Sequence, residues 1–283
     1  MNLSDLLSTV FARRYRRRMP LQSDRRPLSA LADDLVGTTG EISGLALAED
    51  ILSRFEIMDD AQKSEFFHYL ATAMNIDPAS VRRTLEAYEK TPSKASYRAF
   101  ASAAEPARQE MVRRLNRVPG ATGALVRMRA DLLRIGRGVP DLEALDLDFR
   151  HLFSSWFNRG FLVLRPINWE SPAHILEKII AYEAVHAIDS WDDLRRRLEP
   201  TDRRCFAFFH PSMPDEPLIF VEVALNKGIP GSVQRLLAQD RKALPEAEAD
   251  TAVFYSISNC QPGLASISFG NSLIKQVVSD LAT

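Results

Sequence analysis

The stretch that decides the fold is residues 251–281, which read TAVFYSISNCQPGLASISFGNSLIKQVVSDL. Its first nine residues are rich in β-branched and aromatic side chains and predict a strand of central character. A loop with Gly263 and Gly270 follows, and an amphipathic helix ends the stretch. This order brings backbone N–H groups and a positive helix end together, so the sequence predicts a phosphate cradle. The helix is expected to bury Leu273, Ile274, Val277, Val278 and Leu281.

Two serines lie within the predicted strand. Because side chains alternate along a strand, Ser256 and Ser258 share one face with Phe254, and Tyr255 lies on the other. Both hydroxyls need hydrogen-bond partners if they are buried. They bond either to neighbouring backbone or to a ligand in a cleft, and the sequence leaves both open.

The loop after this strand is rich in small residues. Ala265, Ser266 and Gly270 allow a ligand to approach the backbone closely. Free N–H groups between Ser266 and Asn271 are expected to cradle a pyrophosphate.

Composition bounds the class of protein. With 283 residues, 46% of them hydrophobic and 26% charged, the chain is globular, as one large domain or two. A formal net charge of −1 indicates no nucleic-acid partner. No apolar run reaches the ~18 residues that a membrane span requires. Cys205 and Cys260 make no disulfide framework and are expected to be buried, which favours a reducing, cytoplasmic location.

The N-terminal segment 1–20 is amphipathic and then rich in arginine. It is interpreted as a solvated helix with a basic end or as a contact with an anionic partner. An organelle transit peptide is the third interpretation, which Asp5 and the scarcity of serine oppose.

The first half of the chain, residues 1–158, shows helical spacing of apolar residues and predicts an all-helical domain. Asp59 and the Asp77-Pro78 pair are expected to begin helices, because acidic residues and proline suit a first turn. The apolar stripes of these helices, including Leu85 and Tyr88, are expected to form the core. Helices are expected over residues 41–55, 59–74, 77–88, 105–115, 123–136 and 142–157.

From residue 159 the pattern changes to mixed helices and strands, so the fold class is α+β. The segment 161–169 contains Pro166 and predicts an edge strand. Residues 205–210 and 217–225 predict a hairpin. Helices are expected after Ser171-Pro172, after Ser190 and over residues 231–240.

The scattered histidines show neither HxxxH nor CxxC spacing, so no metal site is expected. His186 is interpreted as a helix-end residue, and His210 ends a strand where it either packs or lines a cleft. Glu222 interrupts the apolar run IFVEVAL and is expected on a solvent face or in a salt bridge rather than in a cleft.

Four blocks of the sequence resemble the malonyl-CoA decarboxylase family. The blocks are LVRMRADLL (125–133), SSWFNRGFLVLRPINWESPAHILEKI (154–179), EAVHAIDSWDDLRRRLEPTDRRCFAFFHPSMPDEPLIFVEVAL (183–225) and FYSISNCQPGLASISFGNSLIKQVV (254–278). The resemblance runs over most of the chain and is looser before residue 110.

The resemblance implies an oligomerising helical domain, residues 1–158, and an acetyltransferase-like (GNAT) α/β domain, residues 159–283. It implies cleavage of malonyl-CoA to acetyl-CoA and CO₂ with no cofactor, because the thioester serves as its own electron sink. Ser256 then lines the substrate pocket. The CoA pyrophosphate loop consists of Ala265, Ser266, Ile267, Ser268, Phe269, Gly270 and Asn271.

The resemblance also carries a departure. In the family, the helix that matches Asn271–Leu281 is followed by an L-S-P-x-P-G-F block with the catalytic serine and then by the catalytic histidine. This chain ends at Thr283, so the resemblance implies a truncated catalytic domain with no catalytic residue assigned. The alternative function is a non-catalytic oligomerising module that keeps part of the CoA cleft. An acetyltransferase, suggested by the implied fold alone, is the third.

Overall fold

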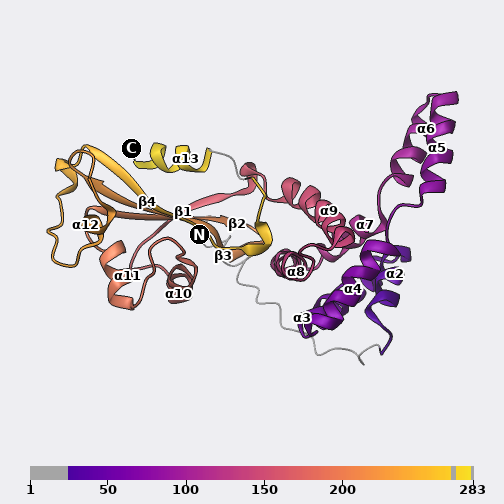
Figure 1. Ribbon diagram of the computed structural model, residues 1–283, viewed down its shortest axis with the longest axis horizontal. Coiled ribbons are helices and arrows are strands. Elements are labelled where there is room, and N and C mark those ends of the chain that lie inside the picture. The colour runs from indigo at the N-terminus through magenta and orange to yellow at the C-terminus, as the bar shows by residue number, and fades with distance from the viewer. Residues whose placement is uncertain (1–24, 269–271, 282–283) are drawn as a thin grey trace, which may run out of the picture. The chain divides into compact units, whose positions relative to one another are not determined.

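The computed structural model describes residues 25–268 and 272–281 (Figure 1). The basic segment 1–20 and the predicted loop residues Phe269, Gly270 and Asn271 lie outside the described residues. The chain divides into two compact units between Ser155 and Trp156. An N-terminal helical unit followed by a small unit of helices and strands confirms the predicted α+β class.

The described part of the first unit is built from helices joined by short loops. They are α2 (Leu28–Gly37), α3 (Glu41–Glu56), α4 (Asp60–Thr72), α5 (Pro78–Lys90), α6 (Lys94–Ala103), α7 (Ala107–Leu115), α8 (Ala121–Ile135) and α9 (Pro140–Trp156).

The predicted helix starts at Asp59 and Asp77 are confirmed. The side chain of Asp59 accepts a hydrogen bond from the backbone N–H of Gln62, and the Gln62 side chain accepts one from Asp59 N–H. Asp77 accepts from the N–H groups of Ala79 and Ser80. These side chains satisfy N–H groups that the first turn of a helix leaves without an intrahelical acceptor.

Most of the predicted stripes are core, and two buried ion pairs lie among them. Arg129 of α8 donates from Nε to Asp146 at 2.7 Å, and Arg108 of α7 donates to Asp148 at 2.5 Å. Fully buried apolar side chains come from helices α2, α3, α4, α7, α8 and α9, among them Leu31, Leu35, Ile51, Phe67, Leu70, Met111, Leu115, Leu125, Leu145 and Phe153.

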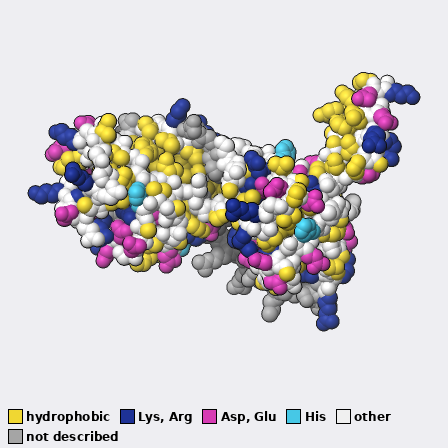
Figure 2. Space-filling view, viewed as in Figure 1, with side chains coloured by type: hydrophobic (Ala, Val, Ile, Leu, Met, Phe, Trp, Pro, Cys, Tyr) yellow, Lys and Arg dark blue, Asp and Glu magenta, His cyan; other side chains and the backbone are white. Residues whose placement is uncertain are grey.

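The hairpin of α5 and α6 corrects one expectation. Both helices exist, but neither buries a residue, and Leu85 is 37% exposed instead of core. Helix α5 packs on α6, where the rings of Tyr88 and Tyr97 lie 6.0 Å apart. Figure 2 shows hydrophobic side chains along this hairpin. Helical periodicity predicted the helix correctly, but the burial of its apolar face depends on whether another element packs against that face.

The second unit contains a four-stranded antiparallel sheet in the order β1-β2-β3-β4 within the described residues. Its strands are β1 (Val163–Ile167), β2 (Arg203–His210), β3 (Met213–Asn226) and β4 (Thr251–Asn259). Its helices are α10 (Ala173–Tyr182), α11 (Trp191–Leu198), α12 (Val233–Leu237) and α13 (Ser272–Leu281), with short 3-10 turns at Arg159–Phe161, Glu246–Glu248 and Pro262–Leu264.

The predicted strands are confirmed at the expected places in the sequence. The strand with Pro166 lies at one edge of the sheet, and β2 and β3 form the predicted hairpin. The helix expected over residues 231–240 is shorter, because α12 covers only Val233–Leu237. The central character expected for β4 is wrong for the described sheet, in which β4 is the other edge and leaves Ile257 42% exposed.

Helices α10 and α11 cover one face of the sheet, and α13 lies on the other side in Figure 1. The α10–α11 face contains the apolar cluster of Ile175, Leu176, Ile179, Leu194, Leu198, Cys205, Ala207, Phe209 and Phe220. Helix α13 buries Leu273 and Val277 as predicted but leaves Ile274 39% and Val278 48% exposed, because the buried stripe of this helix is narrow.

A β-bulge in the β3–β4 pairing overturns the predicted alternation. Glu222 pairs with Ser256, but the next residue, Val223, pairs with Phe254, so Tyr255 is an extra residue on β4. An extra residue breaks the period of two and turns a side chain to the opposite face. Tyr255 and Ser256 are consequently both buried.

Candidate functional site

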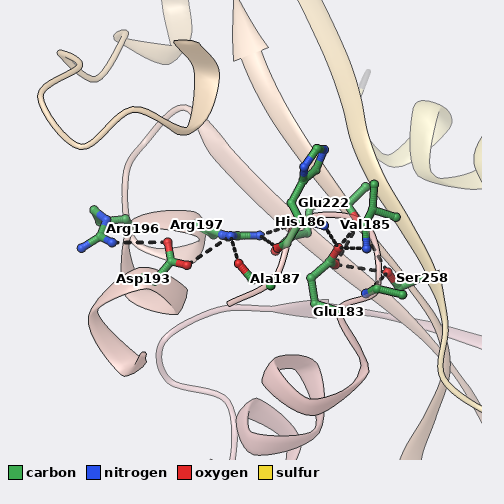
Figure 3. A network of polar contacts seen from close by, with 11 residues as sticks. Glu183, Val185, His186, Ala187, Asp193, Arg196, Arg197, Glu222 and Ser258 are labelled. Carbon is green, nitrogen blue, oxygen red and sulfur yellow. Dashed lines mark hydrogen bonds and ion pairs between the residues drawn. The ribbon is translucent and has the colours of Figure 1, made fainter. Parts of the chain in front are cut away.

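A buried cluster of one carboxylate and two hydroxyls lies on the α10–α11 face of the sheet (Figure 3). Glu183, the residue after α10, is 9% exposed, and Ser256 and Ser258 of β4 are 2% and 1% exposed. The Ser256 hydroxyl lies 2.8 Å from both carboxylate oxygens of Glu183, and the Ser258 hydroxyl donates to Oε2 at 3.2 Å.

Backbone amides complete this cluster. The N–H groups of Val185 and His186 each donate to Glu183 Oε1 at 2.8 Å. Hydrogen bonds to an ionised acceptor are stronger than neutral ones, so these donors stabilise the buried negative charge. The main partner of the serines, the Glu183 side chain, was not among the two alternatives, and Ser258 also accepts a hydrogen bond from the backbone N–H of Ala184 at 3.4 Å. The sequence offered no signal for Glu183 beyond an acidic residue after a helix.

Glu222 lies beside this cluster and is fully buried. Its Oε2 accepts from Arg197 Nη1 at 3.3 Å, and Arg197 Nη2 donates to Asp193 Oδ2 at 3.1 Å. The salt bridge considered for Glu222 is confirmed, and the favoured solvent face is wrong. Arg197 also donates to the backbone carbonyls of His186 at 2.7 Å and Ala187 at 2.9 Å, which fixes the guanidinium in place.

The protonation of Glu222 responds to pH near neutrality. Burial raises the pKa of Glu222 to about 7, and the nearby charge of Glu183 adds to the rise while Arg197 opposes it. Glu222 pairs with Ser256 across the β3–β4 ladder, so its side chain lies on the same face as the Glu183 cluster. The site thus contains two acidic side chains around one serine.

Three buried polar atoms of this region have no hydrogen-bond partner among the described residues: Arg197 Nε, Glu222 Oε1 and Tyr255 OH. Arg197 and Tyr255 each feel the charge of the other and of Glu222, which indicates that the three residues lie near one another. Buried polar atoms are usually satisfied, so these groups mark the site as polar and capable of further hydrogen bonds.

The described part of the predicted CoA loop follows β4 through a turn with buried Gly263 and Leu264. Ala265, Ser266 and Ser268 are exposed, and Ser266 has a φ of 62°, in the left-handed region. Ile267 is buried, and its N–H donates to Leu264 O at 3.0 Å. The free N–H expected at Ile267 is therefore wrong, because the turn itself uses that donor.

The histidines singled out in the sequence have structural contacts. His210 is 8% exposed, its Nε2 lies 3.1 Å from Trp156 O, and its Nδ1 accepts from Ser212 N–H at 3.1 Å. His210 is therefore packed, and burial lowers its pKa. His186 contributes its backbone to the Glu183 and Arg197 contacts.

Cys205 and Cys260 are both buried and free, as predicted, and burial raises the pKa of each thiol. Over residues 25–268 and 272–281, no three His, Cys, Asp or Glu side chains group as a metal site would require. In the same ranges, no helix combines the length and apolar character needed to cross a membrane.

The fold has close counterparts among solved structures. Malonyl-CoA decarboxylase from Rhodopseudomonas palustris superposes with a TM-score of 0.86 at 52% identity, and the match covers 90% of this chain and 62% of that one. The enzyme from Agrobacterium vitis gives a TM-score of 0.85 at 52% identity with the same coverage. Both matched structures are malonyl-CoA decarboxylases, and the match extends over the helical and the α/β parts of this chain.

Sequence comparisons agree with the structures. The profile of the malonyl-CoA decarboxylase N-terminal domain matches residues 74–157, and that of the malonyl-CoA decarboxylase C-terminal domain matches residues 160–283. The chain belongs to the malonyl-CoA decarboxylase family.

Curated relatives are longer than this chain. Mitochondrial malonyl-CoA decarboxylase from Anser anser anser is 39% identical over 183 residues, which are 62% of this chain and 36% of the relative. The Rattus norvegicus protein of the same name is 37% identical over 178 residues, 59% of this chain and 35% of the relative. The matched region thus spans about a third of these relatives' length.

Proposed function

We propose that this chain serves the decarboxylation of malonyl-CoA to acetyl-CoA and CO₂. The observation that carries the proposal is the family match through both units, which includes β4, the loop after it and α13. Loss of CO₂ leaves an enolate on the thioester, which hydrogen-bond donors must stabilise before an acid protonates the carbon. The thioester carbonyl accepts the electron pair, so the proposal includes no metal or organic cofactor. The proposed location is the cytoplasm.

The residues proposed to hold the CoA pyrophosphate are Ala265, Ser266, Ile267, Ser268, Phe269, Gly270 and Asn271. They directly precede α13, and a helix N-terminus favours phosphate through its N–H groups and its dipole. The left-handed backbone at Ser266 and the exposure of its neighbours support this role. Ile267 would anchor the loop through its buried side chain, because its N–H is already bonded.

Ser256 is proposed to line the malonyl end of the substrate pocket together with Glu183. Its hydroxyl has two acceptors at equal distance, so it can turn without losing its partner. The serine and histidine that the family resemblance assigns to proton transfer match no residue of this sequence by motif. The proposal therefore assigns CoA binding to this chain and assigns no acid or base within it.

Two measurements on one purified sample test the proposal. Chromatography measures acetyl-CoA formed from malonyl-CoA at high protein concentration, and calorimetry measures CoA binding. Turnover supports the enzyme, whereas binding without turnover supports the alternative, a non-catalytic module that keeps part of the CoA cleft. Absence of both results overturns the two proposals together.

The alternative also requires self-association through the helical domain, and the α5–α6 hairpin favours it. Leu85 and Tyr97 are 37% and 58% exposed on helices that bury nothing within this chain. Exposed apolar faces of this kind mark contact surfaces. Light scattering should give a homo-oligomer for the chain, and Leu85→Glu should lower its mass while the exposed-site control Glu86→Lys should not. A monomer at all concentrations would rule this role out.

A further inference from the structure

A pocket lined by arginine side chains borders the site described above and shares Asp193 and Arg197 with it. It encloses about 110 Å³ between α11, the start of β2 and the segment after α12. Four arginines line it: Arg196, Arg197, Arg203 and Arg241. A water needs about 10–15 Å³ of comparable space, so the pocket holds several waters or one small ion.

Positive charge exceeds negative charge around this pocket. Asp193 is shared by Arg196 at 3.3 Å and Arg197 at 3.1 Å. Asp202 is shared by Arg203 at 3.8 Å and Arg241, whose guanidinium contacts both carboxylate oxygens. Two carboxylates thus serve four guanidinium groups, and Glu222 adds one further negative charge on the inner side of Arg197. At least one positive charge is left over, and the surplus grows when Glu222 is protonated.

The inner arginines are held in place before any ligand binds. The side chains of Arg197 and Arg203 are 6% and 2% exposed. Arg203 donates to the carbonyls of Asp202 and Leu236, and Arg197 Nε has no partner among the described residues. The charge of Arg241 contributes to a lowered pKa of Arg203, behind the effect of burial, so the two cations repel each other. Asp202 contacts both guanidinium groups and offsets that repulsion only in part, so a further anion beside them would be favoured.

We propose that this arginine pocket binds a phosphate group. Guanidinium groups match the oxygens of phosphate in planar, paired hydrogen bonds, and immobilised arginines lose little entropy on binding. None of the pocket residues belongs to the predicted CoA loop, 265–271, and in Figure 1 α11 and α13 lie on opposite sides of the sheet. The expected source is inorganic phosphate, because the pairings Arg203–Ala224 and Ala224–Val253 put the pocket at the opposite end of β4 from loop 265–271. The second source, the 3′-phosphate of CoA, would require a CoA whose pyrophosphate lies away from that loop.

Calorimetry of the full chain with inorganic phosphate tests the pocket, in phosphate-free buffer with sodium chloride at constant ionic strength. Saturable binding to one site is expected. Arg196→Gln removes a guanidinium at the pocket mouth, whose side chain is 38% exposed, and should weaken binding about tenfold, the loss of one charge-assisted hydrogen bond.

The matched control is Arg195→Gln, one residue earlier on α11. Arg195 pairs with Glu199 and does not line the pocket, so the same loss of charge should leave phosphate affinity within about twofold. A second variant, Gln239→Glu, adds a negative charge at the pocket without disturbing packing and should also weaken binding. No saturable binding to the wild type, or equal losses in the Arg195 and Arg196 variants, overturns the proposal.

Competition of CoA and of dephospho-CoA with bound phosphate distinguishes the two sources of the phosphate group. If CoA displaces phosphate and dephospho-CoA does not, the pocket takes the CoA 3′-phosphate. If neither displaces it, the ligand is a free anion. Displacement of phosphate by both compounds would place the bound phosphate at the CoA loop and would overturn the proposal that the arginine pocket binds it. CoA binding and turnover are measured without phosphate, so failure of the proposed function is seen separately.

Discussion

The Ser256 hydroxyl lies 2.8 Å from both carboxylate oxygens of Glu183, although 73 residues separate the two in the sequence. This contact joins β4, which leads into the predicted CoA loop, to the segment that follows α10. It also gives a buried carboxylate one of its donors, so neither residue can be removed without leaving the other short of a partner.

Replacement of Ser256 by alanine should lower the free energy of unfolding by about 1–3 kcal/mol, because a buried charged acceptor loses a donor. Ser258→Ala is the matched control on the same strand, with a longer bond of 3.2 Å, and should cost less. Urea denaturation measures both variants. Equal effects would show that Glu183 does not discriminate between the two hydroxyls.

Glu222 should make the chain less stable as the pH rises. Its folded-state pKa of about 7 lies above the ordinary value of 4.5, so between these values the folded state binds more protons than the unfolded state. The free energy of unfolding therefore decreases as the pH rises from 4.5 to 7, and the total decrease due to Glu222 is on the order of 3 kcal/mol.

The Glu222→Gln variant tests this contribution directly. Its stability relative to the wild type should increase steadily from pH 5 to pH 8, even though Arg197 loses a charged partner. Denaturation at several pH values measures the difference. A difference that stays constant with pH contradicts the assigned pKa.

His210 should make the chain less stable as the pH falls, which is opposite to the effect of Glu222. Burial lowers its pKa, so the folded state binds fewer protons than the unfolded state once the pH falls below about 6.5. The stability that neutral His210 contributes is complete above that pH and is lost on acidification. In His210→Gln, the loss of stability between pH 7 and pH 5 should be smaller than in the wild type, as measured by thermal unfolding. An unchanged loss of stability between pH 7 and pH 5 in His210→Gln would contradict the role of buried, neutral His210.

Two arginines of α8 should differ sharply in their effect on stability. Arg129 is 1% exposed and bound to Asp146, so Arg129→Ala should cost about 3–5 kcal/mol by leaving a carboxylate without its charge partner. Arg134 pairs with Asp60 at the surface, where solvent screens the interaction, and Arg134→Ala should change stability little. Chemical denaturation compares them, and similar losses would contradict the burial argument.

Local features could be predicted well from the sequence. The helix starts at Asp59, Asp77 and Ser190 are correct because a capping side chain bonds within three residues of itself. The edge position of the Pro166 strand is correct because proline has no N–H to donate.

Burial could be predicted only in part. The stripe of α5 is helical but uncovered, and α13 buries Leu273 while Ile274 stays exposed. Periodicity states which side chains share a face, but the width of the neighbouring surface decides how many are covered.

The sequence by itself determined the family, the α+β order of elements and most of their boundaries, because these depend on local spacing and on blocks of contiguous residues. Only the tertiary structure decided the site. The bulge at Tyr255, the Glu183 cluster and the ion pairs Arg197–Glu222 and Arg241–Asp202 each join segments distant in the chain. Such contacts depend on strand register and helix packing, which no local pattern encodes.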